Sequence, residues 1–215
     1  MAKLTTILFD LDGTLIDSVR LILDSYHHTL ACHGQDPRTD DFWLAGLGTP
    51  LRVQFKHWAE NPEQLEAMIG TYREYNLLHH DSRVMAYPGI VDVVLAIRAA
   101  GYRTGLVTSK NKPGALRGLR LAGLEAAMEL IIGADDVVNP KPHAEPVEAA
   151  LRLIGEPPER ALYVGDSIHD MESGRAAGVK TAAALWGPFG REHLEASAPD
   201  YWLEKPDDLR ILLEL

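Results

Sequence analysis

The sequence has 215 residues, of which 46% are hydrophobic, so it can bury a core in one domain with a sizeable insertion or in two domains. Its formal net charge of −10 at pH 7 argues against a nucleic-acid partner, because proteins that bind the phosphate backbone usually display a basic surface. The single cysteine, Cys32, excludes an internal disulfide, and no apolar run approaches the roughly 18 residues that span a bilayer, so we expect a cytoplasmic protein with no membrane partner.

The first predicted element is a buried strand at residues 5–9, a β-branched and apolar run. Asp10 and Asp12 follow it, and they point the same way if the extended geometry persists, because strand side chains alternate. Two carboxyls held close together tend to have one raised pKa and one charged partner, which suits a nucleophile beside an acid. Taken alone, this pair is also typical of a solvated turn. Thr14 adds a hydroxyl that can hold a carboxylate in place.

The next segment, residues 17–85, is predicted to be helical throughout. Three helix-start signals, at residues 17–18, 49–50 and 61–62, each precede apolar residues at helical spacing. No convincing strand pattern occurs between them. We therefore expect a helical insertion with its own small core.

Helices and strands alternate after residue 88, which is typical of a parallel sheet covered on both faces. The strand candidates are residues 102–108, 129–133, 161–165 and 180–185. Strand 5–9 belongs to the same sheet, so we predict one α/β domain made of residues 1–16 and 86–215, interrupted by a cap domain at residues 17–85. In an open parallel sheet the ligand binds outside the carboxyl ends of the strands.

Several polar residues fall at these strand ends. Thr108 and Ser109 precede a predicted helix, where hydroxyls and free amides can meet an anion. Asp166 follows strand 161–165, and Asp170 lies one helical turn later, so both can face the same ion. Oxygen ligands of this kind suit Mg²⁺, which completes its shell with water and substrate oxygens. Each of these residues, taken alone, is also explained by helix capping.

Lys141 lies in a loop between Pro140 and Pro142, which restrict the backbone and so limit where the ammonium can reach. Most loop lysines are solvated, but an acid cluster elsewhere in the chain favours a functional role for this one. The joint occurrence of these features, in this order and each after a strand, points to one site.

These motifs resemble those of the haloacid dehalogenase superfamily of aspartate-dependent phosphohydrolases. The matching segments are DLDGT at residues 10–14, VTS at 107–109, Lys141, and GDSIHD at 165–170. The helical insertion after the first motif resembles the C1 cap of that superfamily, a lid over a Rossmann-like, doubly wound parallel sheet. The resemblance covers essentially the whole chain.

The resemblance implies a two-step phosphoryl transfer. Asp10 would attack phosphorus and form an aspartyl-phosphate, which water then hydrolyses. Asp12 would be the general acid in the first step and the general base in the second. Thr108 or Ser109 and Lys141 would bind the transferring phosphoryl oxygens.

The resemblance also implies a Mg²⁺ cofactor. Asp10, the backbone carbonyl of Asp12, and Asp166 would hold the ion. Asp170 would be a further ligand or would organise the others. Dehalogenation is disfavoured, because it does not need the acid at Asp12.

The cap carries the discrimination between subgroups. GLGTPLR, residues 46–52, resembles the specificity loop of phosphoglycolate phosphatases, in which Thr49 and Arg52 are candidates to meet a second anionic group. Residues 71–81 and 190–203 look more like the bacterial inorganic pyrophosphatase subgroup, which we favour slightly.

Arg73 is a candidate to contact a distal phosphate of such a small phosphorylated substrate. Two alternatives stay open: a phosphomutase of the β-phosphoglucomutase type, and a receiver-like signalling module that binds phosphate without turnover. The sequence leaves the oligomeric state open.

Overall fold

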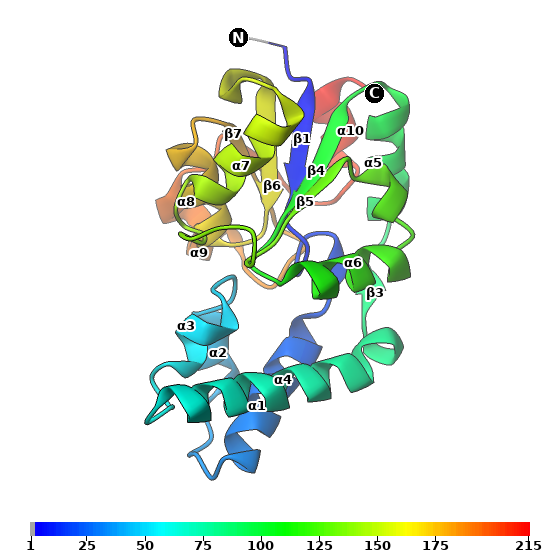
Figure 1. Cartoon of the computed structure of the whole chain (residues 1–215). Coiled ribbons are helices and arrows are strands. Elements are labelled where there is room, and N and C mark those ends of the chain that lie inside the picture. Colours follow the sequence, from blue (N-terminus) through cyan, green and yellow to red (C-terminus); the bar gives the residue numbers. More distant parts are fainter. Residues whose placement is uncertain (1–2) are drawn as a thin grey trace.

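The computed structural model describes residues 3–215, which form a parallel sheet wrapped by helices and a separate group of helices beyond one end of it (Figure 1). The strands of the sheet are β1 (Thr6–Phe9), β4 (Arg103–Val107), β5 (Leu130–Ile132), β6 (Ala161–Gly165), β7 (Lys180–Ala184) and β8 (Tyr201–Leu203). Their order is β5-β4-β1-β6-β7-β8, with every pair parallel. This confirms the doubly wound, Rossmann-like core and puts its switch point at β1 and β6.

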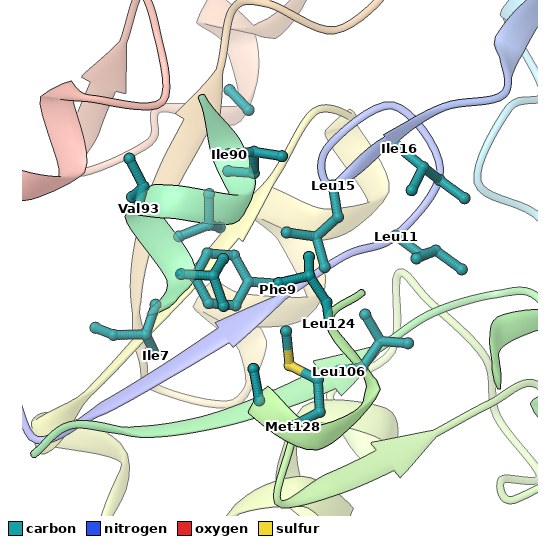
Figure 2. Packing of buried hydrophobic residues seen from close by; sticks show 14 of the residues in the cluster. Ile7, Phe9, Leu11, Leu15, Ile16, Ile90, Val93, Leu106, Leu124 and Met128 are labelled. Carbon is teal, nitrogen blue, oxygen red and sulfur yellow. The ribbon is translucent and has the colours of Figure 1, made fainter. Parts of the chain in front are cut away.

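Helices pack on both faces of this sheet. They are α5 (Ile90–Ala99), α6 (Lys112–Leu121), α7 (Glu145–Ile154), α8 (Ile168–Ala176), α9 (Arg191–Leu194) and α10 (Asp208–Leu213), with short 3₁₀ turns at Glu125–Ala127, Pro158–Arg160 and Glu195–Ser197. Side chains of β1 alternate between two buried clusters: Ile7 and Phe9 pack with Ile90 of α5 (Figure 2), and Leu8 packs with Val147 of α7. Burial on both faces explains why β1 is apolar throughout.

The helical insertion contains α1 (Val19–Cys32), α2 (Asp40–Leu44), α3 (Leu51–Phe55) and α4 (Pro62–Arg83). Its core is aromatic: Tyr26 stacks on Trp43 with ring centroids 4.3 Å apart, and Phe55 meets Tyr26 edge-on at 5.5 Å. An antiparallel ribbon of β2 (Ile16–Asp17) and β3 (Met85–Ala86) joins the insertion to the sheet domain. The sequence did not predict this ribbon, because two residues are too few to show an alternating pattern.

One predicted helix start agrees with the structure and another does not. At residues 61–62 the side chain of Asn61 accepts a hydrogen bond from the Gln64 amide at 2.8 Å, as predicted. At residues 49–50 the predicted cap is wrong, because α3 begins one residue later and the Thr49 hydroxyl donates to the Gly46 carbonyl at 2.7 Å. Within residues 3–215, no helix combines the length and the apolar character that crossing a membrane requires.

Candidate active site

A cleft of about 410 Å³ lies between the carboxyl ends of the strands and the helical insertion. The sheet domain lines it with Asp10, Asp12, Thr108, Ser109 and Lys141, and the insertion lines it with Thr49, Arg52 and Arg73. Asp166 and Asp170 lie against Asp10: one carboxylate oxygen from each of the three falls within 4.8 Å of the others. The fold therefore brings together residues that the sequence places up to about 160 positions apart.

Lys141 is the centre of the buried part of the site. Its Nζ donates hydrogen bonds to Asp10 Oδ1 at 2.9 Å, to Asp170 Oδ1 at 2.6 Å and to the Tyr163 hydroxyl at 3.0 Å. Only 2% of the Lys141 side chain is exposed. An ammonium so far from water needs these charged partners, because unpaired burial of a charge is strongly unfavourable.

The acids around Lys141 carry unequal pKa values. Burial raises the pKa of Asp10 to about 7, even though the charge of Lys141 opposes this shift and that of Asp170 adds to it. Burial, and then the charges of Asp170 and Asp10, raise the pKa of Asp166 well above its usual range. Burial also acts to raise the pKa of Asp170, but Lys141 outweighs it and leaves that pKa lowered. The cluster thus holds more carboxylates than one ammonium can neutralise.

This charge imbalance fits a divalent cation. Asp10 gives one of its oxygens to Lys141, and Asp166 gives one to the Thr14 hydroxyl at 2.8 Å, as expected for Thr14. In each case the second carboxylate oxygen has no side-chain hydrogen-bond partner within residues 3–215 and can bind an ion. Gly13 has a φ of 90°, and a Cβ there would clash with the Asp166 carboxylate, so this backbone closely borders the cluster. An all-oxygen donor set of this kind suits Mg²⁺.

Asp170 has less freedom than Asp10 and Asp166. Its Oδ1 accepts from Lys141 and from the Tyr163 hydroxyl, and its Oδ2 accepts from the Ser167 amide and hydroxyl at 3.0 and 2.6 Å. Ser167 and Asp170 form a reciprocal capping box at the start of α8. Because both of its oxygens are engaged by the chain, Asp170 is better suited to fixing Lys141 than to binding an ion.

Asp12 occupies a different environment from Asp10. Its Oδ1 accepts from the Ser18 hydroxyl at 2.6 Å, and Lys110 Nζ donates to both of its oxygens, at 2.8 and 3.0 Å. Burial would raise the pKa of Asp12, but the charge of Lys110 and these hydrogen bonds outweigh it and hold the pKa below its usual range. The two acids of the first motif thus have pKa values shifted in opposite directions: burial dominates at Asp10, whereas Lys110 and the hydrogen bonds outweigh burial at Asp12.

The two hydroxyls of the second motif differ in availability. Thr108 Oγ1 accepts the Lys110 amide at 3.2 Å, which fixes the turn after β4. The Ser109 hydroxyl is buried at the cleft and has no hydrogen-bond partner within residues 3–215. A buried polar group of this kind requires a partner, and the cleft beside it is where a ligand oxygen would supply one.

The candidate residues of the cap are more exposed than the acids and Lys141 on the sheet side. Arg52 pairs with Glu66 on α4, and about 60% of each side chain is exposed. Arg73 is an exposed residue on the same helix and faces the cleft. Gln54 donates to the Thr49 hydroxyl at 2.6 Å, so Thr49 stabilises the loop before α3 as well as lining the cleft.

Three residues of the site were missed from the sequence. Lys110 and Ser18 contact Asp12, and Tyr163 contacts Lys141. Lys110 directly follows the VTS motif, so its position beside a strand end was the available signal. Tyr163 lies in the middle of β6 and gave no polar signal, because its apolar neighbours indicate only a buried strand.

The family model described as haloacid dehalogenase-like hydrolase matches residues 7–184. The chain is 43% identical over 211 residues to Pyrophosphatase PpaX of Anoxybacillus flavithermus, covering 98% of this chain and 97% of the relative. It is 40% identical to Pyrophosphatase PpaX of Bacillus cereus, again over 211 residues that cover 98% of this chain and 97% of the relative. Among solved structures, a haloacid dehalogenase-like family protein of Streptococcus pneumoniae superposes with a TM-score of 0.84 at 26% identity, over 99% of both chains.

Proposed function

The chain belongs to the haloacid dehalogenase-like hydrolases and is a phosphatase of that family, and we propose that it acts with Mg²⁺ through an aspartyl-phosphate on Asp10. The observation that carries this mechanism is the buried pairing of Lys141 with both Asp10 and Asp170 at the carboxyl edge of the sheet. It holds the Asp10 carboxylate at the wall of the cleft, where it can attack phosphorus as the nucleophile.

In the first step, Asp10 attacks phosphorus and the bond between phosphorus and the leaving oxygen breaks. Asp12 in its protonated form gives its proton to the leaving oxygen as the electron pair departs with it. Lys141 and the free hydroxyl of Ser109 hold the phosphoryl oxygens, with Thr108 fixing the turn that presents Ser109. This step forms the acyl phosphate on Asp10.

In the second step, Asp12 is the base. It takes a proton from water, whose oxygen attacks phosphorus and breaks the bond to Asp10. The lowered pKa of Asp12 supports this role, because Lys110 and Ser18 stabilise its carboxylate form. Inorganic phosphate leaves and Asp12 is again protonated.

Asp10, Asp166 and the backbone carbonyl of Asp12 would hold the Mg²⁺ ion, and Asp170 would keep Lys141 in place. When bound, the ion supplies positive charge for the phosphoryl oxygens. Chelation by EDTA is expected to stop phosphate release and added Mg²⁺ to restore it. Unchanged rates after thorough chelation would contradict this assignment.

The substrate that we favour is inorganic pyrophosphate. The chain matches relatives named as pyrophosphatases over 97% of their length at 40% identity or more. Arg73 and Arg52 line the cap side of the cleft, where a second phosphate would lie. Comparing kcat/KM on pyrophosphate, phosphoglycolate and sugar phosphates with Mg²⁺ tests this preference. Higher efficiency on either of the other compounds would contradict it.

Phosphoglycolate is the second candidate substrate, because the segment GLGTPLR, residues 46–52, resembles the specificity loop of phosphoglycolate phosphatases and its residues 47–52 line the cleft. The same comparison covers the remaining alternatives. Isomerised sugar phosphate would indicate a phosphomutase, and phosphorylation without multiple turnover would indicate a receiver-like module.

We further propose that residues 17–85 act as a lid over residues 1–16 and 86–215. The cleft between the two groups and the two-residue strands that join them support a closing motion. Solution scattering with and without a phosphate analogue tests it, and identical profiles would contradict the motion.

A further inference from the structure

Lys110 forms an ion pair with the Asp12 carboxylate. Its Nζ donates to both carboxylate oxygens, and the two side chains are 16% and 15% exposed. The residues are 98 positions apart in the chain, so the sheet fold alone brings them together. A pair this well shielded is stronger than a surface ion pair, because water screens it less.

The backbone of Lys110 is itself fixed on two sides. Its amide donates to Thr108 Oγ1 at 3.2 Å, and its carbonyl accepts from the Ala134 amide at 3.0 Å. A Cβ on Gly133 would lie 3.0 Å from the same carbonyl, so the next loop packs tightly against it. These contacts fix the backbone of Lys110 and so restrict the positions that its side chain can reach in the cleft.

Ser18 is the second residue that binds the Asp12 carboxylate. It occupies the N-cap position of α1, where a serine normally bonds the exposed amides of the first turn. Its hydroxyl makes no such bond and donates to Asp12 at 2.6 Å. The Ser18 hydroxyl thus orients the Asp12 carboxylate and does not cap α1.

We infer that Lys110 is the positioning residue for Asp12 and that it selects which carboxylate oxygen exchanges the proton. Asp12 Oδ1 accepts two hydrogen bonds, from Ser18 and Lys110, whereas Oδ2 accepts one longer bond from Lys110. Oδ2 is therefore the oxygen that gives its proton to the leaving group. This inference rests on the proposed function, in which Asp12 is the general acid.

A pair of small substrates isolates this role. Acetyl phosphate and ethyl phosphate have similar size and one phosphoryl group, but acetate leaves readily without a proton, whereas ethoxide needs one. Loss of a correctly placed acid should slow ethyl phosphate hydrolysis and spare acetyl phosphate. The readout is kcat/KM, which reports the steps up to departure of the leaving group.

For Lys110→Met we expect kcat/KM to fall by about 10²-fold on ethyl phosphate, as for a misplaced catalytic group, and by less than about threefold on acetyl phosphate. The loss on ethyl phosphate should lie in kcat. Lys110→Gln, which keeps an amide donor, should fall between wild type and Lys110→Met, and it serves as the test variant if the methionine variant does not fold.

Lys112→Met is the matched control. Lys112 lies two residues after Lys110, at the start of α6, but it pairs with Asp136 at 3.3 Å, and 45% of its side chain is exposed. It does not line the cleft, so its variant should match wild type on both substrates. Equal losses on both substrates for Lys110→Met, carried in KM, would mean that Lys110 only contacts phosphate and would overturn the inference.

Asp12→Asn separates failure of this inference from failure of the proposed function. If Asp12→Asn spares acetyl phosphate but Lys110→Met shows no such difference, only the role of Lys110 is wrong. If Asp12→Asn shows no dependence on the leaving group, the proposed function itself is wrong.

Discussion

The two walls of the cleft differ in how their charged side chains are held. On the sheet side, Asp10, Lys141 and Asp170 are each less than a tenth exposed and bonded to one another. On the cap side, Arg52 is paired at the surface. Burying charged side chains costs free energy, so a buried cluster of paired charges is expected where it serves the chemistry. The sheet wall carries such a cluster. The cap wall can vary at little energetic cost, which suits substrate selection.

The largest expected effect is on the sheet wall. Asp10→Asn should lower phosphate release by more than about 10³-fold, because the amide is a far poorer nucleophile. The amide oxygen can still accept from Lys141, so the fold should survive, as circular dichroism would verify. A folded variant with near-normal turnover would show that Asp10 is not the nucleophile.

Stability should separate the two walls next. Lys141→Met leaves Asp10 and Asp170 buried without their shared partner, and we expect it to lower the free energy of unfolding by about 3–5 kcal/mol. Arg52→Met, at the exposed pair with Glu66, should change it by less than about 1 kcal/mol. Urea denaturation of both variants measures the difference, and similar values would erase the proposed contrast.

The cap wall should act on substrate binding. Arg73→Ala is expected to raise KM for pyrophosphate by about tenfold with little change in kcat, through loss of one charged hydrogen bond to the second phosphate. Acetyl phosphate, which has no second phosphate, should be unaffected. An equal effect on both substrates would contradict a distal-phosphate role for Arg73.

The smallest effect concerns pH. Asp10, with its pKa raised to about 7, and Asp166, with its pKa raised well above the usual range, keep protons in the folded state that the unfolded chain has lost above about pH 4. Folding then binds protons, so stability of the metal-free protein should fall as pH rises from about 5 to about 7. Carboxyls with lowered pKa values, such as Asp12, are ionised in both states over this range and contribute no slope.

Thermal unfolding in EDTA at about pH 5 and about pH 7.5 measures this slope. Mg²⁺ should raise the midpoint more at the higher pH, because it binds the ionised carboxylates. Asp166→Asn should flatten the profile. A midpoint that rises with pH in the metal-free wild type would contradict the raised pKa values.

The sequence predicts much of the sheet wall, because several of its polar residues directly follow a strand and so must lie at one edge of the sheet. Asp10, Thr108 and Asp166 are of this kind. The strand β8 and the ribbon of β2 and β3 were missed, since two or three residues show no clear period.

Partnerships across the cleft are harder to predict than positions. Lys110 and Ser18 both lie next to predicted features, but only the folded chain shows that they meet at Asp12. Ser18 looks like a helix cap in the sequence, and Lys110 looks like a solvated loop lysine. Local patterns report local structure, whereas these contacts form only in the fold, where β1 pairs with β4 and α1 begins beside Asp12.

The most direct test of the central claim is to look for the phosphorylated enzyme. Wild type would be mixed with ³²P-labelled pyrophosphate and Mg²⁺, quenched in acid during turnover and digested, and the labelled peptide identified. The account predicts label on the peptide that contains Asp10, bound to Asp10 itself, and none on Asp10→Asn. Full turnover without labelled enzyme, or label on another residue, would contradict it.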